Sequence, residues 1–253
     1  MLMRMSFRCA SLYMLLVAAA THNALAATHM RSTEERVSLI ELYTSEGCSS
    51  CPPAEAWFNA LKTDPRLWRQ IVPVAFHVDY WDHLGWQDRY AKPEFTERQQ
   101  DYQMTGAVRV VYTPGMIIDG REWRGWFDRQ SLPSASMEKA GVLQATLDES
   151  ILSAEFFPSK ALKAPLILNV VLLGFGLSVD VARGENGGKK LEHDFTVLGI
   201  ETFSLATGIA KFQWNVSLKP LISKSKETPR GIALWVTEAG KPRPLQATGA
   251  WLP

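Results

Sequence analysis

In the first half of the chain, two stretches of consecutive apolar residues flank a stretch in which apolar residues recur at helical spacing. The continuous runs at residues 37–43 and 71–79 are typical of buried strands. Between them, apolar side chains at residues 56–61 recur three to four positions apart, which predicts a helix packed on a sheet. A strand, a helix and a second strand at this spacing predict a right-handed crossover unit.

The pattern continues with a second helix and a hairpin. A helix is expected at about residues 93–104, because Pro93 suits a first helical turn. Asp119-Gly120 suits a tight hairpin turn, with residues 121–127 as the returning strand. A last helix is expected at roughly residues 133–147. The buried positions of that helix would include Met137, Leu143 and Leu147.

From about residue 150 the pattern changes to short apolar runs separated by turns rich in Gly, Asn and Lys. Such spacing is typical of a small antiparallel sheet or sandwich. We therefore predict one domain at residues 27–149 and a β-rich C-terminal domain at residues 150–253. The apolar runs are residues 166–171, 177–181, 193–197, 209–216 and 231–236.

The first residues are expected to direct export. Arg4 and Arg8 precede an apolar run at residues 9–20, and Ala24-Leu25-Ala26 is a small-x-small cleavage signal. The run is too short to span a bilayer. These features predict a signal peptide at residues 1–26, a periplasmic or secreted protein and no membrane contact after cleavage, with an uncleaved anchor as the alternative.

Composition narrows the function classes. The formal net charge is +1 and the charges are mixed along the chain, so no footprint for nucleic acid or an acidic membrane surface is present. Of three cysteines, Cys9 lies in the predicted signal peptide, which leaves Cys48 and Cys51. Two cysteines cannot form a disulfide framework, so the core must come from apolar packing. Nothing in the sequence indicates an oligomeric state.

Cys48 and Cys51 lie where the first strand ends and the first helix begins. The amides and dipole of a helix N-terminus favour a thiolate at Cys48, which is therefore the predicted nucleophile. Cys51, one helical turn inward, would be the resolving thiol. A stable structural disulfide is the alternative, but such a bridge closes a very small loop and stabilises little by chain entropy.

The order strand-helix-strand-helix-strand-strand-helix resembles the thioredoxin fold, an α/β fold whose dithiol opens the first helix. That resemblance implies a cis-proline before the hairpin, and Thr113-Pro114 stands at the matching place. A cis bond there would leave a backbone edge beside the dithiol for an extended substrate peptide. The fold expected is thus a thioredoxin-like core with a C-terminal antiparallel, sandwich-like β domain.

The chain also resembles a family of exported proteins known as domain of unknown function 1223. That resemblance implies a thioredoxin-like fold and export, but no activity. It spans nearly the whole mature chain. The matching pieces are residues 41–54, 76–82, 84–86, 95–99, 112–114 and 183–186.

Other polar and aromatic residues are candidates for roles around the dithiol. Glu41, on the strand that leads to it, could exchange a proton with the inner thiol, or could instead pair with an arginine or solvent. Tyr80 and Trp81, with Thr113, could bind substrate, since their loop follows the C-terminal end of a central strand. The segment at residues 183–186 is expected to be a strand-joining turn.

The function expected from these residues is exchange of disulfides with a protein or small-thiol substrate, catalysed by Cys48, Cys51, Pro114 and Glu41. No cofactor and no nucleic-acid partner are expected. One alternative is a metal carrier, perhaps for copper, because thiolates and imidazoles suit Cu(I) or Zn²⁺. Its ligands would be Cys48, Cys51, His77 and His83. Another alternative is a thioredoxin-like binding module without catalysis.

Overall fold

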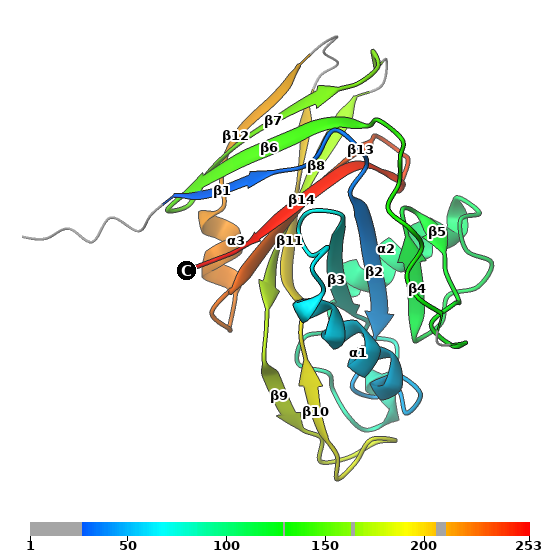
Figure 1. Cartoon of the computed structure of the whole chain (residues 1–253). Coiled ribbons are helices and arrows are strands. Elements are labelled where there is room, and N and C mark those ends of the chain that lie inside the picture. The colour runs from blue at the N-terminus through cyan, green and yellow to red at the C-terminus, as the bar shows by residue number, and fades with distance from the viewer. Residues whose placement is uncertain (1–26, 129, 163–164, 206–210) are drawn as a thin grey trace, which may run out of the picture.

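The computed structural model describes residues 27–128, 130–162, 165–205 and 211–253 (Figure 1). The predicted signal peptide lies outside the described residues, as do residues 209 and 210 of a predicted strand. Within the described ranges, no helix has the length and apolar character to cross a membrane.

The chain forms fourteen strands and three α-helices over the described residues, with two short 3₁₀ helices. The strands of the first half are β1 (Thr28–Arg31), β2 (Ser38–Thr44), β3 (Ile71–His77), β4 (Gly115–Ile118), β5 (Arg121–Glu122) and β6 (Gly141–Asp148). The remaining strands are β7 (Ile151–Pro158), β8 (Leu166–Gly174), β9 (Leu177–Asp180), β10 (Lys190–His193), β11 (Thr196–Leu205), β12 (Phe212–Ser217), β13 (Gly231–Glu238) and β14 (Pro244–Trp251). The helices are α1 (Pro52–Asn59), η1 (Ala60–Thr63), η2 (Asp82–Leu84), α2 (Pro93–Met104) and α3 (Lys219–Lys224).

One large sheet of eight strands runs through the molecule in the order β14-β13-β8-β11-β3-β2-β4-β5 (Figure 1). β2 and β3 are parallel and in register, so that Thr44 pairs with His77. β11 joins β3 in parallel at a single pair, Thr196 with Ala75. The other neighbours in the sheet are antiparallel. The sheet is therefore mixed, with its parallel pairs at the centre.

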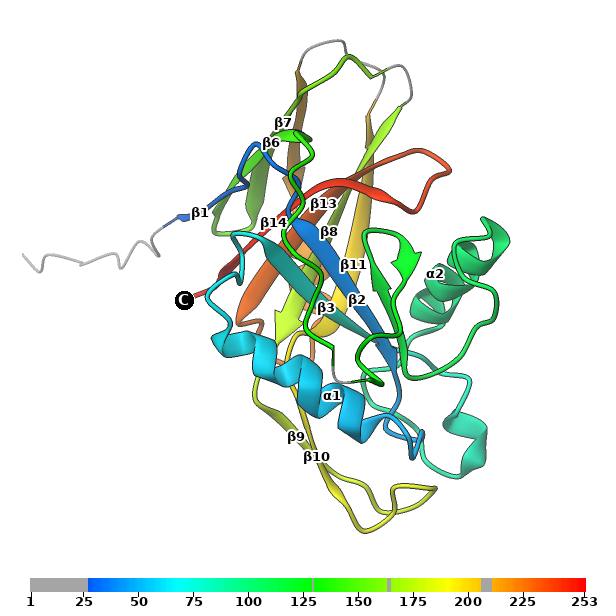
Figure 2. The ribbon, with the colours of Figure 1, turned by 45° about the vertical axis from the view of Figure 1, so that its right-hand side comes forward.

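The two longer helices lie on opposite faces of this sheet (Figure 2). Successive residues of a strand point to opposite faces. At the end of β2, Thr44 donates a hydrogen bond to Glu55 of α1, whereas Tyr43 packs edge-on against Tyr102 of α2, with ring centroids 6.5 Å apart. The α1 face of β2 and β3 is the one that bears the candidate site.

A smaller antiparallel sheet, in the order β1-β6-β7-β12, covers the other part of the large sheet (Figure 1). β8 serves two cores because its two faces are both buried: Leu168 and Leu172 face the small sheet, while Val171 and Leu173 belong to the core around the helices. β9 and β10 form a separate hairpin that extends beside α1.

The expected α/β, thioredoxin-like core with an appended sandwich-like domain is wrong. Strands hold 42% of the residues and helices 15%. The edge of β3 that such a core would leave free is instead continued by β11, β8, β13 and β14. The apolar runs at residues 166–171 and 231–236 are buried on both faces in that shared sheet, so they are not the half-exposed strands of an independent sandwich.

The helix expected at residues 133–147 is also wrong. Leu143 and Leu147 fit a helical spacing, but Ala145 between them is buried too, and the alternating burial is that of β6. Met137 is 86% exposed. The return strand expected at residues 121–127 is shortened to β5. By contrast, α2 has the predicted bounds, and the Asp119-Gly120 turn has positive φ at both residues, as a tight hairpin requires.

The boundary predicted at residues 149 and 150 falls in the turn of the β6–β7 hairpin. Strands from both sides of it contribute to the large sheet. The division into two domains stays a prediction.

Candidate functional site

The turn between β2 and α1 holds the predicted dithiol. Cys48 and Cys51 form a disulfide whose Cα atoms are 5.5 Å apart. Cys51 is the N-cap of α1, and Pro52 occupies the first turn, where its missing N–H leaves no helical hydrogen bond unmade. Both cysteine side chains are buried, whereas Ser49 and Ser50 between them are exposed. An incoming thiol therefore contacts Ser49 and Ser50 before it can reach the sulfur atom of either cysteine.

The connection between β9 and β10 covers the dithiol. Asn186, which is fully buried, donates two hydrogen bonds of 2.9 Å from Nδ2 to the backbone oxygens of Glu46 and Cys48. The backbone N–H of Ser49 donates to Glu185 Oε2 at 3.0 Å. The segment expected to be only a strand-joining turn is thus also fastened to the cysteine turn from 138 residues away in sequence.

Replacing Asn186 with alanine is expected to speed reduction of the Cys48–Cys51 disulfide by dithiothreitol. Losing the two hydrogen bonds weakens the contact between the β9–β10 connection and the cysteine turn by about 1–2 kcal/mol. This contact should then open roughly 5–30 times more often. Stopped-flow reduction, followed by alkylation and mass analysis, measures the rate. Asn215→Ala, at an exposed position on β12, is the matched control. Equal reduction rates in both variants would show that Asn186 does not shield the disulfide.

The predicted substrate-binding residues are brought together beside the same turn. Trp81 Nε1 donates to Thr113 Oγ1 at 2.7 Å. Gly47 lies against Trp81 so closely that a Cβ on Gly47 would be 3.1 Å from the Trp81 Cβ. The Thr113–Pro114 peptide bond is cis, as expected. Tyr80 is half-buried, and burial raises its pKa to about 12, so its hydroxyl stays protonated at neutral pH.

Glu41 lies on the other face of β2 and takes part in a separate polar group. Arg98 Nε donates to Glu41 Oε2 at 2.8 Å, and Tyr43 donates to the same oxygen at 2.9 Å. Tyr102 donates to the second carboxylate oxygen. Burial, together with the Glu41 charge, raises the pKa of both tyrosines well above the usual value. Glu41 is therefore paired with an arginine, and it does not lie beside the inner thiol, as proton exchange with that thiol would require.

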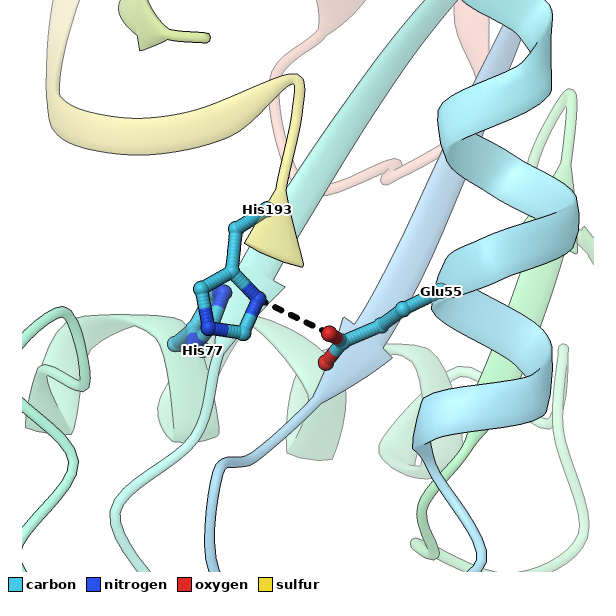
Figure 3. A group of neighbouring side chains, drawn as sticks. All are labelled: Glu55, His77 and His193. Atoms are coloured by element: carbon cyan, nitrogen blue, oxygen red, sulfur yellow. Dashed lines mark hydrogen bonds and ion pairs between the residues drawn. The ribbon is translucent and has the colours of Figure 1, made fainter. Parts of the chain in front are cut away.

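Beside the cysteine turn, on the face of β2 and β3 that α1 covers, lies a buried cluster of five titratable side chains: Glu46, Glu55, His77, Asp88 and His193. We call it the His–carboxylate cluster. His77 Nδ1 lies 2.7 Å from Asp88 Oδ2, and His193 Nδ1 lies 2.8 Å from Glu55 Oε2. Figure 3 shows Glu55 reaching from α1 towards His193 at the end of β10, with His77 beneath from β3.

The charges of the cluster follow from burial and mutual contact. Burial alone would lower the pKa of His77, but Asp88, with Glu55 and Glu46 nearby, outweighs it and raises the pKa to about 9. Burial opposes ionisation of Glu55 and Asp88, yet the facing histidines lower the pKa of both carboxyl groups. The pKa of Glu46 is raised, first by burial and then by the Asp88 charge. The cluster is thus a tightly coupled group of buried charges.

The metal ligands predicted from the sequence do not come together. Cys48 and Cys51 are bonded to each other, and His83 is exposed on η2. Only His77 belongs to the cluster, where it groups with Glu55 and His193 so that their candidate ligand atoms all lie within 4.8 Å of one another.

Sequence reasoning missed four cluster residues as site candidates: Glu46, Glu55, Asp88 and His193. Glu46 precedes the dithiol by two residues and Glu55 follows Cys51 by one helical turn, so their positions were a usable signal. Asp88 and His193 come from a loop and a distant hairpin. Trp86 donates a hydrogen bond of 2.6 Å to Glu46 Oε2.

Comparison with known proteins gives a family and a fold. The sequence pattern of a family described as "Protein of unknown function (DUF1223)" matches residues 39–237. A protein of Agrobacterium tumefaciens, known from an X-ray crystal structure, is similar at 23% identity and a TM-score of 0.61, over 87% of this chain and 95% of that one. HBP35 of Porphyromonas gingivalis is similar at 16% identity and a TM-score of 0.53, over 87% and 76%. No curated protein matches the sequence. At these identities the likeness shows a shared fold alone.

Proposed function

The chain belongs to the DUF1223 family of proteins of unknown function. We propose that it is an exported thiol–disulfide oxidoreductase. In this proposal Cys48 and Cys51 exchange disulfides with a protein or small-molecule thiol in the periplasm or outside the cell. The observation that carries the proposal is the disulfide between two cysteines at the N-terminus of α1.

The position of this disulfide favours exchange over a structural role. The bridge closes a loop of three sequence steps, which constrains the unfolded chain little. A helix N-terminus stabilises a thiolate, so the reduced form is chemically competent. Trp81 and Thr113 lie beside the turn, where an extended peptide could be held. A purely structural bridge would need neither neighbour.

The reaction proceeds in two exchanges. A substrate thiolate attacks Cys48 Sγ, the Cys48–Cys51 bond breaks, and Cys51 leaves as a thiolate. A second substrate thiolate then attacks the substrate sulfur of this mixed disulfide, and Cys48 leaves as a thiolate. The substrate loses two electrons and the protein gains them. The same steps in reverse reduce a substrate disulfide.

Glu41 has no part in this mechanism, because its carboxylate is held by Arg98 and two tyrosines on the opposite face of the sheet. The carboxyl group on the dithiol's own helix is that of Glu55, whose backbone N–H donates to Cys51 O at 3.0 Å. Its side chain is paired with His193.

A trapping experiment tests the proposal. Reduced Cys51→Ser, mixed with glutathione disulfide, is expected to accumulate a stable mixed disulfide at Cys48, seen as one added glutathione by intact mass. Reduced Cys48→Ser is the matched control, and we expect it to react at least about ten-fold more slowly, because the Ser50 hydroxyl, 3.3 Å from Cys48 Sγ, can stabilise a thiolate at Cys48. Absence of adduct in Cys51→Ser, or equal rates in both variants, would contradict the assigned roles.

A further inference from the structure

Two buried polar atoms of the His–carboxylate cluster face each other without a hydrogen bond. Among the described residues, Glu46 Oε1 and His193 Nε2 have no partner. They lie 3.7 Å apart, which is too far for a hydrogen bond, and both side chains are essentially fully buried. An unpaired buried polar atom costs about 1–3 kcal/mol, so this pair marks a cluster that is incomplete without a further partner.

The side chains around these atoms form a donor set for a metal ion. Candidate ligand atoms of Glu55, His77 and His193 all lie within 4.8 Å of one another. His193 meets Glu55 through Nδ1 and Glu46 through Nε2, so an ion beside Glu55 would leave Nε2 facing Glu46. Two imidazoles and the two oxygens of one carboxylate suit Zn²⁺, which binds nitrogen and oxygen ligands in tetrahedral sites. We propose that Glu55, His77 and His193 bind one Zn²⁺ ion in the His–carboxylate cluster.

The surroundings also resemble those of a metal site. His77 directs Nδ1 to Asp88 at 2.7 Å, and a carboxylate behind a ligating histidine fixes the ring and leaves its other nitrogen for the ion. Glu46 stands in the same way behind His193, because Trp86 donates to its Oε2 at 2.6 Å and leaves Oε1 to face Nε2 of His193. Three carboxyl groups share this interior with two imidazoles, and buried carboxylates need a compensating cation.

The ligand atoms can close on an ion with small movements. An ion equidistant from three atoms 4.8 Å apart would lie about 2.8 Å from each, so each atom must move by roughly 0.7 Å to reach the usual zinc distances. The space lined by Thr44, Glu55, His77 and His193 has no room for a water molecule. The ion would therefore be held by protein atoms alone, as in a structural zinc site.

Such an ion would join three parts of the chain. Glu55 comes from α1, His77 from β3 and His193 from β10. The ion would anchor the hairpin whose connection covers the disulfide. The site uses no cysteine, and it does not depend on the proposed oxidoreductase activity.

Zinc binding to the full-length chain with its disulfide intact tests this proposal, because the oxidised sulfurs cannot act as thiolate ligands. Equilibrium dialysis with a chelator as competitor, read by elemental analysis, is expected to give one Zn²⁺ per chain. His193→Gln and Glu55→Gln are each expected to weaken the affinity by at least about 100-fold. His83→Gln, the same change at an exposed histidine, should leave it unaltered.

Several outcomes would overturn the proposal: no zinc in the oxidised chain, equal losses in His83→Gln and His193→Gln, or loss of binding in Cys48→Ser/Cys51→Ser. If a cluster variant does not fold, Co²⁺ bound to the unsubstituted oxidised chain decides. Tetrahedral d–d bands without sulfur-to-cobalt charge transfer are expected, and their absence would contradict the site.

Discussion

Replacing Arg98 with methionine is expected to lower the free energy of unfolding by about 3–5 kcal/mol, the usual cost of leaving a buried charge without its partner. Glu41 is 1% exposed and Arg98 is 15% exposed. The guanidinium also lies over the rings of Phe76 and Trp235, at 5.4 and 4.9 Å from their centroids. Methionine keeps much of that packing, so the loss isolates the charge.

Urea unfolding followed by tryptophan fluorescence measures this effect, and for a chain of this size the midpoint of thermal unfolding should fall by roughly 6–20 °C. Glu41→Gln in the Arg98→Met background is the control. It removes the unpaired charge, so the double variant is expected to be more stable than Arg98→Met alone. A double variant less stable than Arg98→Met, or a loss below about 1 kcal/mol in the single variant, would contradict the buried pair.

The metal-free protein is expected to lose stability as the pH rises from about 6.5 to about 9. The pKa of His77 is 6.5 in an ordinary environment and about 9 in the fold, where Asp88, Glu55 and Glu46 surround it. A group whose pKa is raised by folding stabilises the protein fully below its unfolded pKa. That contribution is lost as the pH rises through the folded pKa, and here it amounts to about 3 kcal/mol.

Unfolding free energies measured with a chelator present, at pH values of about 6 and about 9.5, test this expectation. The unsubstituted chain should be less stable at the higher pH, and His77→Gln should show little of that slope. His83→Gln, with an exposed imidazole, should keep it. A slope that persists in His77→Gln would assign the pH dependence to another group.

The parts of the fold that the sequence predicted are those coded within a few residues. α2 has the predicted bounds because Pro93 starts it, and β2 and β3 follow from continuous apolar runs. The helix predicted at residues 133–147 was wrong because Leu143 and Leu147 fit the spacing of a helix as well as that of a strand. The pairing of β6 with β7 decided for the strand. The large sheet could not be read locally, since β11 meets β3 across more than a hundred residues of sequence.

The candidate site also has residues that the local sequence predicts and residues that only distant contacts bring together. Cys48 and Cys51 lie within four residues and carry their own signal, and Thr113-Pro114 was found from the hairpin that follows it. Glu46 and Glu55 could have been found from their spacing to the cysteines, but their partners could not, because His77 and His193 meet only when β10 docks beside α1. Glu41 was given a catalytic role because the sequence does not say which face of β2 borders the dithiol.

A redox equilibrium titration of the Cys48–Cys51 pair in glutathione or dithiothreitol buffers tests the proposed disulfide exchange most directly. Tryptophan fluorescence and the mass added by alkylation would follow the oxidised fraction. We predict a reversible two-electron transition with a midpoint of roughly −270 to −120 mV, the range of working dithiols. A disulfide that resists reduction until below about −300 mV would be structural, and the proposed exchange chemistry would be wrong.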